Sequence, residues 1–223
     1  MERVTIDIVS DVVCPWCYLG KARLELAIAE VQDELGVDVN WHPYQLNPDI
    51  PPEGVDQKAY LEEKLGGAEA VARGHEMLTK LGQEVGIRYD FDAIKIGPNT
   101  LDAHRLLHWA SIEGREVQDR VATALFKANF EEGRNVGDHT VLAEIAESCG
   151  MDRNVVENLL KSDADRDTIL GEIDAAQKMG VNGVPFFIID GQYAISGAQT
   201  PDVLAGALRD VAKLKAEARK GMI

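Results

Sequence analysis

One pair of cysteines, Cys14 and Cys17, constrains this chain more than any other feature, because it stands where an expected strand gives way to an expected helix. We expect the strand over Val4 to Val9 and the helix over Tyr18 to Leu35, whose apolar residues recur at the spacing of one packed helix face. Pro15 then falls at the first helical position, where its missing N–H is not needed. One helical turn separates the two cysteines, so their sulfurs share a face and can reach disulfide geometry.

Thiol chemistry is the leading hypothesis for this motif. The unpaired amides at the start of the helix favour a thiolate at Cys14, so we predict that Cys14 is the nucleophile and Cys17 the resolving thiol. A zinc site would need two more ligands, and the chain has only one further cysteine, Cys149, and no second CxxC or CxxH, so no metal is expected. Cys149 is expected to be a buried small hydrophobe, with an exposed regulatory thiol as the alternative.

The composition limits the partners and the compartment. The formal net charge of the 223 residues is -15, and no basic patch of useful length opposes it, so nucleic acid is not an expected partner. The chain lacks a run of about 18 apolar residues, so no membrane span is expected. The N-terminus leads directly into a strand without the apolar core of a signal peptide, which predicts a cytoplasmic protein. A monomer and a homodimer both remain open.

Strand patterns occur at both ends of the chain. Val37 to Tyr44 is expected to return parallel to the first strand after the crossover helix. Near the other end, Phe186 to Ile189 and Gln192 to Ser196 flank Asp190-Gly191, a pair favoured in tight hairpin turns. A final helix is expected from Pro201. The two ends together predict a four-stranded mixed sheet with flanking helices.

The middle of the chain is predominantly helical, with one weak strand pattern at Ile87 to Phe91. The expected helices cover Gln57 to Lys64, Glu69 to Val85, Thr100 to Ser111, Val117 to Phe130, His139 to Cys149, Arg153 to Lys161 and Ala164 to Lys178. We therefore predict an α/β fold with a large all-helical insertion. The sheet domain is expected to be discontinuous, over residues 1–50 plus 176–223, and the inserted helical domain to span residues 51–175.

These motifs resemble a known family. The Cys-Pro-Trp-Cys turn, the helical insertion and the later run Gly183-Val184-Pro185-Phe186-Phe187 are similar to the DsbA-like branch of the thioredoxin superfamily. The string from Asp11 to Gly20, with Pro98-Asn99-Thr100 leading into Ala103-His104-Arg105, is similar to FrnE-type proteins within that branch. The resemblance covers essentially the whole chain and implies a thioredoxin-like fold and thiol-disulfide exchange on protein or small-molecule disulfides and dithiols.

The resemblance also implies roles for single residues. It implies a cis peptide between Val184 and Pro185 beside Cys14, with Val184 presenting its backbone to an extended substrate segment. It suggests that the segment from Asn99 to His104 borders the cleft. Trp16 is expected to line the substrate approach.

Three polar residues, Asp11, His104 and His108, invite weaker hypotheses. Asp11 is a candidate for tuning a thiol or relaying a proton, with a turn-stabilising role as the simpler alternative. His104 and His108 are spaced to share a helix face, but without a carboxylate and histidine pattern around them, packing or surface roles are favoured over a metal site.

Two other function classes stay open. Kappa-type glutathione transferases and 2-hydroxychromene-2-carboxylate isomerases share the inserted-helix architecture and use glutathione as a bound thiol, but typically carry a serine where this chain has Cys14. We therefore expect no resident cofactor, with glutathione as a possible co-substrate. A non-enzymatic holdase that binds unfolded chains in an apolar cleft is the second alternative, and activity that survives loss of Cys14 would indicate it.

Overall fold

The computed structural model describes residues 1–220 of the chain. Its strands and helices follow one another in the order β1 (Glu2–Ser10), α1 (Pro15–Val31), β2 (Leu35–Pro43), β3 (Val55–Asp56), α2 (Gln57–Leu65), α3 (Ala68–Glu84), β4 (Ile96–Gly97), α4 (Leu101–Glu113), α5 (Arg115–Phe130), α6 (His139–Ser148), α7 (Arg153–Leu160), α8 (Arg166–Lys178), β5 (Phe186–Ile189), β6 (Tyr193–Ser196) and α9 (Pro201–Lys220).

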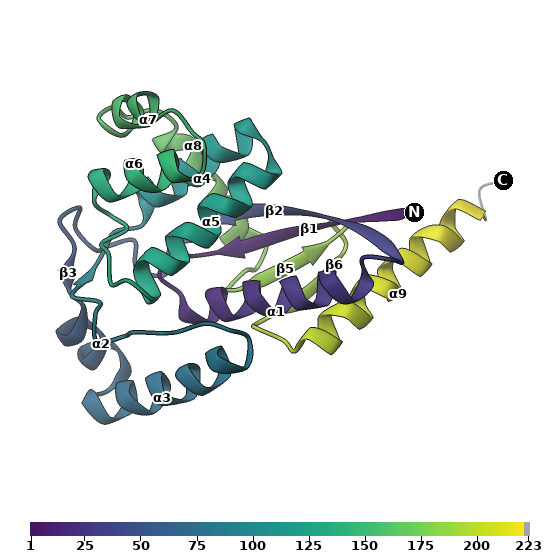
Figure 1. Ribbon diagram of the computed structural model, residues 1–223, viewed down its shortest axis with the longest axis horizontal. Helices are drawn as coiled ribbons and strands as arrows, with labels where there is room; N and C mark the ends of the chain where they lie inside the picture. The colour runs from purple at the N-terminus through teal and green to yellow at the C-terminus, as the bar shows by residue number, and fades with distance from the viewer. Residues whose placement is uncertain (221–223) are drawn as a thin grey trace.

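The four longer strands form one sheet in the order β2-β1-β5-β6. Strand β1 pairs in parallel with β2 and antiparallel with β5, so Ile8 lies opposite both Trp41 and Phe187. Strand β6 pairs antiparallel with β5. The predicted four-stranded mixed sheet is therefore confirmed, and its strands come from opposite ends of the chain (Figure 1).

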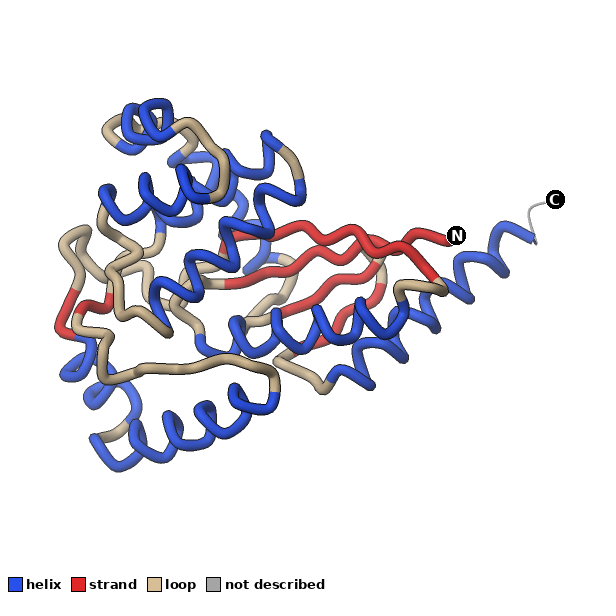
Figure 2. Tube along the Cα trace, in the orientation of Figure 1, coloured by secondary structure: helices blue, strands red, loops and turns tan. Residues whose placement is uncertain are grey.

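One buried face explains the alternating apolar residues of β1. Val4, Ile6 and Ile8 share this face and are at most 1% exposed, whereas Thr5 and Asp7 between them are only partly buried. Helices α1 and α9 pack against each other, and α9 also contacts β1, while α4, α5 and α8 contact β2. Figure 2 shows α1 and α9 running along the sheet, with α2 and α3 beyond one end of α1. The start of α1 thus lies between the sheet and the inserted helices.

Side-chain caps and one buried arginine organise the inserted helices. Asp56, Asp138 and Asp152 accept hydrogen bonds from the first backbone amides of α2, α6 and α7, which fixes where these helices begin. Arg105 is 1% exposed and donates to three backbone carbonyls in the last turn of α7 and the connection to α8, as well as to Asp102. This guanidinium ties α4 to the α7–α8 connection.

The structure corrects the sequence prediction in three places. The segment Ile87 to Phe91 is not a strand; its apolar side chains pack against the core beside α1. The first helix ends at Val31 rather than Leu35, because Leu35 already pairs with Glu2 in the sheet. The two-residue strands β3 and β4 pair with each other and were not predicted. The division into domains at residues 50 and 176 stays a prediction.

Candidate active site

The turn before α1 places the two cysteines. Cys14 is the N-cap residue of α1, and its backbone N–H donates to the carbonyl of Asp11 at 3.0 Å. The Cys14 carbonyl accepts from the N–H of Cys17 at 3.0 Å, and Pro15 occupies the first turn as predicted. Both cysteines are free thiols, and Cys14 is 4% and Cys17 1% exposed. The motif therefore places the Cys14 sulfur at the positive end of the helix.

The loop before β5 lies against this turn. The peptide between Val184 and Pro185 is cis, as the resemblance implied, and the thiol of Cys14 donates to the Val184 carbonyl with a sulfur–oxygen distance of 3.6 Å. Gly20, one turn after Cys17, leaves room for the ring of Pro185: a Cβ on Gly20 would lie 2.9 Å from Pro185 Cγ. Cys14 and Val184 are 170 residues apart in the sequence, and the pairing of β1 with β5 brings them together.

The two thiols have different surroundings. Burial raises the pKa of Cys17 well above its ordinary value, and the neighbouring Cys14 raises it further. The hydroxyl of Ser10 and the backbone of Asp11 act in the opposite direction without cancelling the effect of burial. Cys17 is therefore held as a protonated thiol behind Cys14, whereas Cys14 lines an open cleft.

This cleft has a volume of about 310 Å³ and is bounded by the motif, α2, α3 and the loops after β2 and before α4. Cys14, Pro15 and Trp16 form one wall. The opposite side is mainly apolar, and Lys64 supplies a cation there, bonded to Asn47 and to the Tyr60 hydroxyl. A ligand bound in the cleft would contact the Cys14 side of the motif and not Cys17.

One residue of the site escaped the sequence prediction. The hydroxyl of Tyr89 donates to the carbonyl of Pro15 at 2.6 Å. The Tyr89 ring stacks on Phe91, which stacks on His75 of α3 at a centroid distance of 4.0 Å. Burial raises the pKa of Tyr89, so the phenol remains a donor. The alternation of Ile87, Tyr89 and Phe91 was the available signal, but it indicated a strand.

Asp11, Asn99 and His104, the weaker candidates from the sequence, lie outside the lining of the cleft. Asp11 is fully buried, and its Oδ2 accepts the N–H of Leu46 at 2.8 Å. His104 is 2% exposed and lies 3.5 Å from Asp11 Oδ1, measured from its Nε2. The amide of Asn99 donates to the Ile50 carbonyl at 2.7 Å, which ties the loop after β2 to the start of α4. His104 lines a second pocket rather than the cleft beside Cys14.

The other candidates give no sign of a metal centre. Within residues 1–220, the structure contains no group of three or more histidine, cysteine and acidic side chains arranged to hold a metal ion. Cys149 is a buried thiol at the end of α6, far in sequence from the motif, and burial raises its pKa. No helix in this part of the chain is long and apolar enough to cross a membrane.

Comparison with known proteins places the chain in a family. The sequence model of the DSBA-like thioredoxin domain matches residues 5–209. The uncharacterized protein YwbO of Bacillus subtilis is 29% identical over 222 residues, which cover 95% of this chain and 99% of YwbO. The structure of the probable DsbA oxidoreductase SCO1869 from Streptomyces coelicolor superposes with a TM-score of 0.83 at 33% identity, covering 93% of this chain and 89% of the other.

Two more distant structures share the fold. A 2-hydroxychromene-2-carboxylate isomerase gives a TM-score of 0.72 at 19% identity, over 96% of this chain and 98% of the isomerase. The cytosolic disulfide reductase DsbM from Pseudomonas aeruginosa, solved with GSH, gives 0.60 at 16% identity, over 94% and 99% of the two chains. With its family match over nearly the whole length, the chain belongs to the DSBA-like thioredoxin domain family.

Proposed function

We propose that this protein is a dithiol-disulfide oxidoreductase in which Cys14 is the nucleophile, Cys17 is the resolving thiol and Val184 presents its backbone to the substrate. The observation that carries the proposal is the position of the Cys14 sulfur. It lies at the N-cap of α1, on the wall of the cleft and 3.6 Å from the Val184 carbonyl oxygen. A helix N-terminus stabilises a thiolate, and the neighbouring backbone can pair with an extended segment.

The reaction proceeds in two exchanges. The thiolate of Cys14 attacks one sulfur of a substrate disulfide, so a Cys14–substrate bond forms and the other substrate sulfur leaves as a thiolate. Cys17 then loses its proton and attacks Cys14, which breaks the mixed disulfide and releases the second substrate thiolate. The protein ends with a Cys14–Cys17 disulfide, and the two electrons have passed to the substrate. The reverse sequence oxidises a dithiol substrate.

Disulfides and dithiols of proteins or small molecules are the proposed substrates, and glutathione is a proposed co-substrate in a reducing, cytoplasmic environment. The likeness in fold to DsbM, whose structure contains GSH, supports glutathione. Asp11, Asn99 and His104 support the site from outside the cleft, since none of the three lines it. The FrnE-type branch remains a prediction within the family.

The test is the equilibrium of the Cys14–Cys17 disulfide in graded mixtures of reduced and oxidised glutathione, followed by mass spectrometry after acid quenching. We expect a reversible two-electron transition, and reduction of a disulfide protein substrate that disappears in C14S. The midpoint of the transition gives the favoured direction. Full turnover in C14S would contradict the proposal.

A glutathione-dependent isomerase is the second candidate. The apolar cleft of about 310 Å³ and the likeness in fold to the isomerase favour it. In that case C14S would still bind glutathione saturably, and the wild-type protein would isomerise an aromatic substrate without forming a Cys14–Cys17 disulfide. Calorimetric titration of glutathione into C14S and C17S separates the two candidates.

A further inference from the structure

One partly buried phenol reaches the active-site turn from a segment that the proposed reaction does not use. The hydroxyl of Tyr89, in the connection between α3 and β4, donates to the carbonyl oxygen of Pro15 at 2.6 Å. A carbonyl oxygen can only accept, so the phenol is the donor in this bond. The bond therefore joins Tyr89 to the backbone between the two cysteines.

The peptide unit that receives this bond also carries the first amide of the helix. Pro15 has no N–H, so the peptide that joins Pro15 to Trp16 supplies the first N–H of α1. The amide of Cys17 already donates to the Cys14 carbonyl at 3.0 Å, whereas the N–H of Trp16 has no acceptor within residues 1–220. Trp16 is the second residue of the helix, from which a cap side chain accepts. A thiolate at Cys14 is therefore best placed to accept from the N–H of Trp16.

A hydrogen bond to the oxygen of a peptide unit strengthens the donor on its nitrogen. The Tyr89 hydroxyl draws electron density toward the Pro15 oxygen, which leaves the N–H of Trp16 more positive. Polarisation of this kind strengthens a neighbouring hydrogen bond by about 10–30%. Tyr89 thus acts on the Cys14 sulfur through one peptide unit of the motif.

The packing of the Tyr89 ring fixes the direction of its hydroxyl. The ring stacks on Phe91 at a centroid distance of 4.9 Å, and Tyr18 and Phe130 form T-shaped pairs with it at 5.8 and 5.6 Å. Gly82 of α3 lies against the same ring, because a Cβ on Gly82 would be 2.6 Å from Tyr89 Cε2. Burial raises the pKa of Tyr89, so the phenol keeps its proton. The hydroxyl is therefore a fixed donor aimed at the motif.

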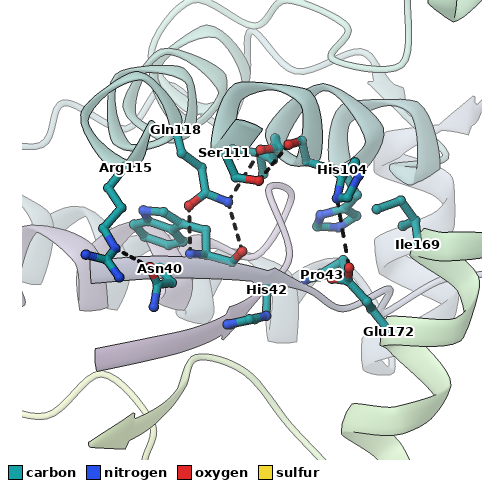
Figure 3. Close-up of a pocket in the computed structure, with 12 residues that line it drawn as sticks. Asn40, His42, Pro43, His104, Ser111, Arg115, Gln118, Ile169 and Glu172 are labelled. Atoms are coloured by element: carbon teal, nitrogen blue, oxygen red, sulfur yellow. Dashed lines mark hydrogen bonds and ion pairs between the residues drawn. The ribbon is translucent and has the colours of Figure 1, made fainter. Parts of the chain in front are cut away.

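The surroundings of Cys14 leave the backbone as the main source of thiolate stabilisation. Its sulfur bonds the Val184 carbonyl and, within residues 1–220, no charged side chain. Figure 3 shows His42 and His104 at a second pocket between β2 and the helices α4, α5 and α8, which shares no lining residue with the cleft. The titratable groups around the motif are Asp11 before α1, Cys17 and Tyr18 on α1, Lys64 on α2, His75 on α3, Arg88 and Asp90 beside Tyr89, and Glu131 after α5.

We propose that Tyr89 is a positioning residue that activates Cys14, by donating to the Pro15 carbonyl and so strengthening the N–H of Trp16 as a donor to the thiolate. This inference rests on the proposed function, in which Cys14 attacks the substrate. It also sets the direction of the effect on the exchange equilibrium. The thiolate occurs in the reduced protein and not in the Cys14–Cys17 disulfide, so Tyr89 stabilises the reduced form and makes the disulfide a stronger oxidant.

The experiment measures the pH dependence of Cys14 alkylation in a C17S background. The rate of iodoacetamide addition is followed from about pH 4 to pH 10 by mass spectrometry of the Cys14 peptide, because the thiolate is the reacting form. The test variant is Y89F, which keeps the ring and removes the donor. The matched control is Y18F, which removes the hydroxyl of a ring packed against Tyr89 that donates to Glu131 at 2.8 Å instead.

We expect the midpoint of the pH profile to rise by about 0.4 pH unit in Y89F, which is a loss of about 2.5-fold in the ratio of thiolate to thiol. In Y18F the midpoint should stay within about 0.1 pH unit of the parent. With Cys17 present and at a pH above the midpoint, the equilibrium with glutathione should shift in Y89F by the same factor toward the Cys14–Cys17 disulfide. A purely structural role of Tyr89 would lower the stability and leave both readouts unchanged.

Gly82 offers a second way to displace the hydroxyl. In G82A the new Cβ presses on the Tyr89 ring, so the midpoint should rise as it does in Y89F. In the double variant with Y89F it should rise no further than in Y89F alone, because no hydroxyl is left to displace. Should Y89F not fold, the midpoint of G82A decides.

Separate outcomes overturn the role of Tyr89 and the function beneath it. A Y89F midpoint within about 0.1 pH unit of the parent refutes the role, as does an equal rise in Y18F. Equal effects of G82A with and without the Tyr89 hydroxyl refute it as well. If the wild-type protein forms no Cys14–Cys17 disulfide with oxidised glutathione, the proposed function itself fails, whatever the midpoints are.

Discussion

The contact between the active-site helix and the Val184–Pro185 loop predicts the effect of a single methyl group. In Gly20→Ala, the new Cβ would lie 2.9 Å from Pro185 Cγ and 3.3 Å from Phe187 Cζ. Neither ring can rotate out of the way, because one is cyclised onto the backbone and the other is 1% exposed in the core. Overpacking of this kind costs about 1–3 kcal/mol.

A second glycine supplies the matched control. Gly171 lies within α8, and no atom lies within 4 Å of a Cβ placed on it. Alanine is about 1 kcal/mol more favourable than glycine inside any helix, so both substitutions gain this amount and the difference between them isolates the contact with Pro185. Gly171→Ala should raise the free energy of unfolding by about 1 kcal/mol, and Gly20→Ala should leave it unchanged or lower it by up to about 2 kcal/mol.

Urea denaturation of the reduced proteins at pH 7 measures both free energies, and the rate of adduct formation with oxidised glutathione reports the site. Relief of the clash moves the Val184 carbonyl away from Cys14, so adduct formation should change in Gly20→Ala and not in Gly171→Ala. If Gly20→Ala gains as much stability as Gly171→Ala, α1 and the loop are not in the close contact described, and the reasoning is refuted.

Three further substitutions test separate contacts. Tyr89→Phe removes the donor to the Pro15 carbonyl and should lower the free energy of urea unfolding by about 0.5–1.5 kcal/mol; no change would mean that water replaces the phenol. Arg105→Met leaves three backbone carbonyls and the Asp102 carboxylate without their donor, and should lower the free energy of unfolding by about 3–5 kcal/mol in the same assay. A loss below about 1 kcal/mol would contradict the role of this side chain in joining α4 to the α7–α8 connection. Burial acts to raise the pKa of Asp102, but hydrogen bonds from Arg105 and His139 outweigh it and hold that pKa below its usual 3.8. The resulting stability is present above about pH 4 and is lost as the pH falls through the lowered pKa, so the urea midpoint of Asp102→Asn should decline less between pH 5 and pH 2 than that of wild type.

The parts of the fold that the sequence could predict are those determined locally. Proline after Cys14 marks the start of α1, and Asp190-Gly191 between two apolar runs marks the β5–β6 hairpin. Both signals act within a few residues, and the structure agrees with both. The end of α1 was misplaced because Leu35 continues the apolar spacing of the helix, while its pairing with Glu2 across the sheet decides its conformation.

The parts that could not be predicted depend on contacts between distant segments. Tyr89 follows Pro15 by 74 residues, and His104 follows Asp11 by 93 residues along the chain. Alternating apolar residues from Ile87 to Phe91 indicate a strand wherever a partner strand is available, but here the segment passes beside α1 and its aromatic rings stack on one another. The spacing of apolar residues cannot distinguish a paired strand from such a segment, because it carries no information about the segment packed against it.

The positions of the two thiols give them separate roles in the exchange. Cys14 lines the cleft and Cys17 does not, although only Pro15 and Trp16 separate them along the chain. A substrate that covers Cys14 therefore closes the cleft at the moment when Cys17 must lose a proton. Resolution therefore has to start from the buried side of the motif, where Cys17 is 1% exposed behind Cys14.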